Sequence, residues 1–298
     1  MPVMPLFLTP NCVFLPKKLN SAPVMTTIFR FKPVVSLLFA ALFVSGCNTT
    51  NLTTTQEIEK EQGTTENISS LTRVVNQNPR DPEAYNVRGS AYGRSGQISA
   101  ALKDFNTAIS LNSRYYQAYS NRALMYKNTG NFNKAVRDYN AAIAINPSYA
   151  EAYIGRGDVY DRVNRPQSAL RDYNRAIELG TTNPRAYQRR GLLKQKSRDH
   201  AGAIEDFSKA LSFADQQPEP YNARGLSYLA GGALENALDD FNTALKIDSR
   251  YAEAWTNQAL VYEQRGQKKR AFKSYARAVA LNPKYQPARD GMSRTRGA

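Results

Sequence analysis

An aromatic residue returns every 34 positions along about two thirds of this chain, and no insertion or deletion interrupts the count. A fixed period of this length is typical of repeat proteins, in which each unit packs mainly on its neighbours. The recurring aromatic residues are Tyr85, Tyr119, Tyr153, Tyr187, Tyr221 and Trp255. They divide residues 82–285 into six units, at 82–115, 116–149, 150–183, 184–217, 218–251 and 252–285.

Each unit contains two sets of residues at helical spacing. In the first half, a glycine or alanine follows the leading aromatic by four residues, and in five units a tyrosine comes three residues later. In the second half, two alanines seven residues apart flank a phenylalanine or tyrosine. These spacings place side chains on one stripe of an α-helix, so each unit is predicted to form two amphipathic helices. The expected fold is all-α, a solenoid of stacked αα-hairpins.

The order of small, aromatic and alanine positions resembles the signature of the tetratricopeptide repeat (TPR) family. The resemblance implies a TPR superhelix and covers the six units. Residues 68–81 match the second helix of an incomplete repeat, and residues 286–298 are expected to form a short capping helix and a basic tail. Such terminal half-units shield the open ends of a stack.

A charged pair recurs in the first five units. Arginine follows the leading aromatic by three residues and aspartate precedes the second-helix aromatic, whereas the sixth unit has Gln258 and Ser274 at these positions. Because the two charges occur together and are absent together, we expect an arginine–aspartate bridge inside each of the five hairpins, which leaves neither charge uncompensated. The alternative is a ladder of ligand-binding arginines.

The N-terminal region resembles a bacterial lipoprotein signal. An apolar run at 34–44 follows Arg30 and Lys32, and it is shorter than the roughly 20 residues that span a bilayer. The sequence Val44-Ser45-Gly46-Cys47 resembles a lipobox. We therefore expect residues 1–46 to be a signal segment, with Met25 as the natural start, and Cys47 to carry lipid. An ordinary signal peptide and a fortuitous apolar helix are the alternatives.

This resemblance also implies a location. Residues 47–67 are polar, lack a hydrophobic stripe and are expected to form a flexible tether. Asn48, rather than aspartate, follows the cysteine, which favours the outer membrane. The protein is therefore expected in the bacterial cell envelope, lipid-anchored at the outer membrane and facing the periplasm.

Residues suited to catalysis are scarce. His200 is the only histidine, and both cysteines, Cys12 and Cys47, precede the repeats. The sequence contains no glycine-rich phosphate loop and no metal-ligand spacing. We expect a non-catalytic protein without cofactor or metal, with catalysis by carboxylates alone as the alternative.

The net charge of +15 identifies a further possible binding surface. Basic residues concentrate in the first half of unit four and between Arg265 and Arg296, where Asp290 is the only acidic residue. Such a patch attracts anionic surfaces or acidic proteins. Nucleic acid is not the expected partner, because the chain is expected to be exported.

In the TPR family, the first helix of each hairpin lines a groove that holds peptides or partner segments. The corresponding residues here are Asn121, Leu124, Asp158, Asp161, Arg185, Gln188, Arg189, Leu192, Lys196, Asn222 and Leu226. Mixed charges beside leucines can orient a bound segment. The clamp with which some members hold a C-terminal carboxylate is not reproduced.

The resulting hypothesis is a lipid-anchored adaptor that holds protein partners, such as cell-wall hydrolases or proteases, at the envelope. The first alternative is a structural protein whose basic C-terminal end docks on peptidoglycan or lipopolysaccharide. The second is an accessory factor in outer-membrane protein assembly. All three rest on analogy with the fold.

Overall fold

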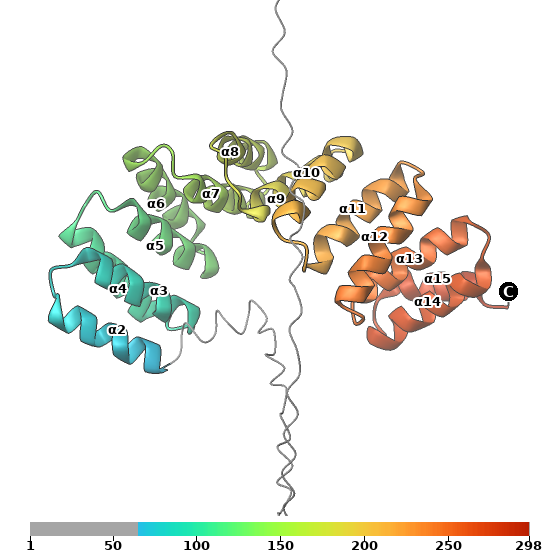
Figure 1. The fold of residues 1–298 in the computed structure, drawn as a ribbon, viewed down its shortest axis with the longest axis horizontal. Coiled ribbons are helices and arrows are strands. Elements are labelled where there is room, and N and C mark those ends of the chain that lie inside the picture. The colour runs from blue at the N-terminus through green and yellow to red at the C-terminus, as the bar shows by residue number, and fades with distance from the viewer. Residues whose placement is uncertain (1–64, 298) are drawn as a thin grey trace, which may run out of the picture. The chain divides into compact units, whose positions relative to one another are not determined.

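The computed structural model describes residues 65–297, all within the compact unit Leu52–Ala298. These residues form helices and no strand (Figure 1). The helices are α2 (Thr65–Gln77), α3 (Pro82–Arg94), α4 (Ile98–Leu111), α5 (Tyr116–Asn128), α6 (Phe132–Ile145), α7 (Ala150–Arg162), α8 (Pro166–Glu178), α9 (Pro184–Lys196), α10 (His200–Phe213), α11 (Pro218–Ala230), α12 (Leu234–Ile247), α13 (Ala252–Gln264), α14 (Lys268–Leu281) and α15 (Gln286–Thr295).

Six consecutive helix pairs, from α3–α4 to α13–α14, pack as antiparallel hairpins and follow one another in chain order (Figure 1). The second helix of each hairpin packs on the first helix of the next, as α4 does on α5. Each first helix also contacts the next first helix, so α3, α5, α7, α9, α11 and α13 form one continuous surface, here called the first-helix face. The predicted all-α hairpin solenoid is confirmed.

Small residues and aromatic rings meet inside each hairpin, as their spacing predicts. A Cβ atom added to Gly89 would lie 2.8 Å from the ring of Phe105, and one added to Gly157 would lie 2.8 Å from the ring of Tyr173. At these two positions a side chain would fit only if the ring shifted, whereas units two and six accommodate Ala123 and Ala259 at the same position. The rings and the flanking alanines are almost fully buried, which makes a continuous core along the solenoid.

The predicted ion pairs are present in the first five hairpins. In each, arginine Nε and Nη2 donate to the two oxygens of the aspartate at 2.6–2.9 Å. The pairs are Arg88–Asp104, Arg122–Asp138, Arg156–Asp172, Arg190–Asp206 and Arg224–Asp240. In the sixth hairpin, the Ser274 hydroxyl donates to Gln258 Oε1 at 2.6 Å.

Half-units lie at both ends of the described region. Helix α2 packs on α3, and α15 packs on α14 and α13. No helix within residues 65–297 has the length and apolar character of a membrane span. The predicted signal segment, the predicted lipidation site Cys47 and residues 48–64 of the predicted tether lie outside the described residues, and the last tether residues, 65–67, form the start of α2.

Candidate functional site

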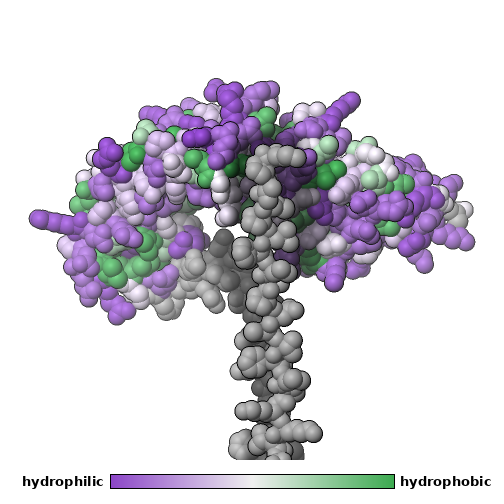
Figure 2. All heavy atoms as spheres, turned by 45° about the horizontal axis from the view of Figure 1, so that its top comes forward, coloured by the Kyte–Doolittle hydropathy of each residue, from purple (hydrophilic) through white to green (hydrophobic). Residues whose placement is uncertain are grey.

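Two adjoining pockets open on the first-helix face at α5, α7 and α9. Their volumes are about 160 Å³ and about 260 Å³, and both are lined by Lys127, Asp158 and Arg185. Leu124 and Ile154 add apolar surface to the smaller pocket, which also contains several polar side chains. Figure 2 shows that hydrophilic side chains cover most of one face of the described region, with apolar ones in separate patches. Charged and hydrogen-bonding side chains line both pockets, and the smaller pocket has apolar surface as well.

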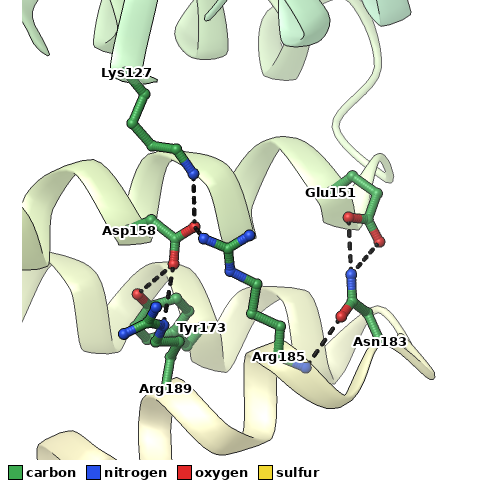
Figure 3. Close-up of polar contacts among 7 residues, drawn as sticks. All are labelled: Lys127, Glu151, Asp158, Tyr173, Asn183, Arg185 and Arg189. Carbon is green, nitrogen blue, oxygen red and sulfur yellow. Dashed lines mark hydrogen bonds and ion pairs between the residues drawn. The ribbon is translucent and has the colours of Figure 1, made fainter. Parts of the chain in front are cut away.

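Asp158 of α7 is the centre of this site (Figure 3). Its Oδ2 accepts from Lys127 Nζ of α5 at 3.1 Å and forms an ion pair with Arg185 Nη2 of α9. Its Oδ1 accepts from the Tyr173 hydroxyl of α8 at 3.1 Å and lies 3.9 Å from Arg189 Nε. We call Asp158 with the three cations the Asp158 cluster. It joins three consecutive repeat units through one carboxylate.

Local structure holds the α9 side of the cluster in place. Asn183 caps α9, because its Oδ1 accepts from the Arg185 backbone N–H at 3.0 Å. Asn183 Nδ2 donates to both carboxylate oxygens of Glu151 at 3.1 Å, which ties the start of α9 to α7 (Figure 3). The cap and this contact together position Arg185 opposite Asp158.

Burial and charge are unevenly distributed in the cluster. The side chains of Asp158 and Lys127 are 7% and 11% exposed, whereas those of Arg185 and Arg189 are 43% and 42% exposed. Desolvation lowers the pKa of Lys127, although Asp158 opposes this effect, and the two arginines lower it further. Burial, followed by the charge of Asp158, raises the pKa of Tyr173. Three cations thus face one carboxylate, and the cluster has an excess of positive charge.

The structure brings six of the predicted groove residues to these pockets and their edge. Asn121, Leu124, Asp158 and Arg185 line the smaller pocket, and Asp161 and Arg189 line the larger one. Asn121 also donates to Asn86 Oδ1 at 2.9 Å.

The other five predicted residues lie elsewhere. Leu192 and Leu226 pack against the cores of units four and five. Asn222 is buried and bonds to Tyr251 and Asn257. Lys196 lines a separate pocket beside the start of α8, and Gln188 is half-buried on α9.

Sequence reasoning missed Lys127, Tyr173 and Asn183. Lys127 occupies the same unit position in α5 that Asp161 occupies in α7, so extending the predicted face of α5 by one turn would have found it. Tyr173 was assigned only to the core, and its hydroxyl distinguishes it from Phe105, which has the same position in unit one. Asn183 precedes Pro184, a pattern typical of a helix N-cap followed by proline at the first position.

Known proteins with similar sequence patterns share the repeat architecture. Residues 124–163 and 225–266 match a family described as "TPR repeat". Residues 252–285 match "Tetratricopeptide repeat", as do residues 82–115, 150–179 and 184–217. The comparison with curated proteins found no match.

Solved structures show the same fold at low sequence identity. The Cut9–Hcn1 hetero-tetramer of the APC/C is 18% identical with a TM-score of 0.65, and the alignment covers 81% of this chain but only 48% of that one. YrrB, described as a TPR protein with an unusual peptide-binding site, is 22% identical with a TM-score of 0.57, covering 63% of this chain and 97% of that one. PilW, a type IV pilus biogenesis factor, is 19% identical with a TM-score of 0.61, covering 70% and 97%.

Proposed function

Because this chain belongs to the tetratricopeptide repeat family, we propose that it is a non-catalytic adaptor that binds a segment of a protein partner on its first-helix face. The Asp158 cluster carries this proposal. It is a charged, partly open site at the middle of a continuous helical surface, with apolar side chains beside it. Proteins of this fold include one with a peptide-binding site and one that functions in pilus biogenesis.

The placement of ionisable side chains in the described region supports the proposed adaptor role. In residues 65–297, no group of histidine, cysteine, aspartate and glutamate side chains is placed to hold a metal ion. His200, the only histidine, is the first residue of α10 and outside both pockets of the site. Three carboxylates line the pockets, those of Glu151, Asp158 and Asp161, and Asp158 already accepts from one lysine, one arginine and one tyrosine.

We also propose that the adaptor acts at the bacterial cell envelope, anchored by lipid on Cys47. The lipobox-like sequence before Cys47 and the polar residues after it support this location. Growth with a clickable fatty acid should label the wild-type protein and not the Cys47→Ala variant. Persistent labelling of the variant would refute the anchor at this residue.

The adaptor function can be tested by affinity capture with in-cell crosslinking. The bait is the full chain, compared with a variant that carries Arg185→Gln and Arg189→Gln. We expect discrete proteins to be enriched on the wild type. They should be reduced on this variant, because it removes the two exposed arginines through which the site binds a partner. Equal capture by both baits would show that the Asp158 cluster does not contribute.

A second candidate function is docking of the C-terminal end on an anionic envelope polymer. It is favoured by three exposed cations, Lys269, Lys273 and Arg277, which follow one another at four-residue spacing on α14. Replacing all three with glutamine should abolish salt-sensitive retention on purified peptidoglycan or lipopolysaccharide. Retention that is unchanged in this variant would exclude this surface.

A further inference from the structure

The Asp158 cluster departs from the charge balance of the repeated ion pairs. In four of the five hairpins with an arginine–aspartate pair, one arginine binds one aspartate, and in unit four Lys194 adds a second cation to Asp206. At Asp158, three cations share one carboxylate, and Arg162 also lines the larger pocket. Asp161 is the only other acidic residue lining that pocket, which leaves a positive excess.

The cluster also has more hydrogen-bond donors than its one carboxylate can accept. Asp158 accepts from Lys127 and Tyr173, is paired with Arg185, and lies 3.9 Å from Arg189. A carboxylate has about four acceptor positions, so little capacity remains. The cations have spare donors, since a guanidinium offers five N–H groups in a planar fork. Arg185 Nε is buried and has no hydrogen-bond partner.

We propose that the Asp158 cluster captures the side-chain carboxylate of an acidic residue in an extended peptide, and that Asp158 is a built-in competitor for the same cations. The inference rests on the proposed adaptor function and specifies its ligand. The incoming carboxylate accepts from the free edges of Arg185 and Arg189, the two most exposed members of the cluster. Asp158 keeps the cations in place when no peptide is bound, and this contact weakens their attraction for the ligand.

The neighbouring pocket indicates a peptide rather than a uniformly anionic polymer. The partly exposed Leu124 offers apolar contact beside the cations, whereas Ile154 lines the pocket but is almost fully buried. Ser120, Asn121 and Asn183 add hydroxyl and amide groups to the same pocket. An acidic residue with an aliphatic neighbour matches this mixture, whereas an anionic polysaccharide has no aliphatic side chain to place there. The burial of Lys127 makes its charge more effective toward a bound anion.

Fluorescence anisotropy with defined peptides tests the proposal on the full chain. The probe is a dye-labelled peptide of alternating glutamate and leucine, blocked at its C-terminus so that no terminal carboxylate is present. The control peptide has glutamine in place of glutamate. The variants are Asp158→Asn, Asp161→Asn, and the double variant Arg185→Gln with Arg189→Gln. The matched control is Arg137→Gln with Arg171→Gln, which removes two exposed charges from the second helices α6 and α8.

We expect the glutamate peptide to bind the wild type about tenfold more tightly than the glutamine peptide, and the double arginine variant to lose this preference. Asp158→Asn should tighten binding of the glutamate peptide about three- to tenfold, because the competing charge is gone while an oxygen remains for Tyr173. Asp161→Asn, at the edge of the cluster, should tighten it less, and the control on α6 and α8 should leave it unchanged.

Several results would overturn the inference. Unchanged or weaker binding to Asp158→Asn would show that Asp158 does not compete, provided that its thermal melt matches the wild type. If that variant does not fold, unchanged or weaker binding to Asp161→Asn refutes the competition. Binding only to a peptide with a free C-terminus, or stronger binding to an anionic polysaccharide, would contradict the ligand class. Partner capture that is the same for the wild type and these variants would refute the inference alone, whereas a wild-type bait that enriches no protein would refute the adaptor function.

Discussion

The repeated arginine connects two hairpins through one guanidinium group. In units two to five, Nε and Nη2 bind the aspartate of the same hairpin, while Nη1 donates to a side chain of the preceding second helix at 2.6–2.9 Å. The acceptors are Asn106, Asn140, Asn174 and Ser208. In unit six, Gln258 donates to Asn242 at 2.7 Å and accepts from Ser274. The same contacts are therefore made there without charge.

The uncharged pair of unit six, Gln258 and Ser274, suggests substitutions that test the arginine–aspartate pairs of the other units. Arg122→Gln alone leaves the buried Asp138 without a cation, and we expect it to reduce the free energy of unfolding by about 3 kcal/mol. Adding Asp138→Ser copies the unit-six arrangement and should restore a large part of the loss, because no buried charge is left unpaired. Urea unfolding of the wild type, both single variants and the double variant measures this coupling. Additive losses would show that the two residues act independently.

At the scale of the helices, the bend inside each hairpin requires a left-handed backbone. Gly96, Gly130, Gly232 and Gly266 have φ values between 69° and 78° at this position. Units three and four place Asn164 and Arg198 there, with φ values of 56° and 65°. Four units have glycine at this position in the sequence, but the sequence does not show that an arginine in unit four adopts the same conformation.

Arg198→Gly is expected to stabilise the protein by about 1 kcal/mol, because glycine adopts positive φ without the steric cost of a Cβ atom. Arg198 is exposed, so no buried contact is lost. The reciprocal change, Gly130→Arg, should destabilise by a similar amount. Asn164→Gly should change stability less, because asparagine tolerates this conformation better than arginine. Thermal melts of the three variants give the order of their stabilities. A decrease for Arg198→Gly would mean that its side chain stabilises the bend.

At the scale of the whole molecule, the period of the sequence predicted the fold because every unit repeats the same local packing. The candidate site was only partly predictable. Asp158 and Arg185 were identified as first-helix residues, but their pairing with Lys127 joins residues of three different units. A periodic pattern reports what the units share, whereas this cluster depends on side chains in which they differ. The hydroxyl of Tyr173 also depends on the choice between phenylalanine and tyrosine at a core position that holds tyrosine in three of the six units.

Each hairpin packs only on its neighbours in the stack. The stack is therefore expected to open most easily from its ends. At the C-terminal end, Arg294 of α15 donates to Glu263 of α13 through two bonds of 3.0 Å, and the Tyr275 hydroxyl donates to the same carboxylate at 2.7 Å. The Arg294 hydrogen bonds are the main cause of a lowered pKa for Glu263. Arg294 is half exposed, so we expect the pair to contribute less than about 1 kcal/mol.

The Arg294–Glu263 pair predicts that the C-terminal end of the stack is less stable in acid. Because the pKa of Glu263 is lower in the folded protein, its contribution is present above the ordinary carboxyl pKa and is lost as pH falls through the folded value. Amide hydrogen exchange in α15, corrected for intrinsic rates, should therefore accelerate relative to α9 on acidification. In Glu263→Gln, α15 should exchange faster at neutral pH and respond less to acid. If α15 of the variant keeps the acid response of the wild type, another group must control this end of the stack.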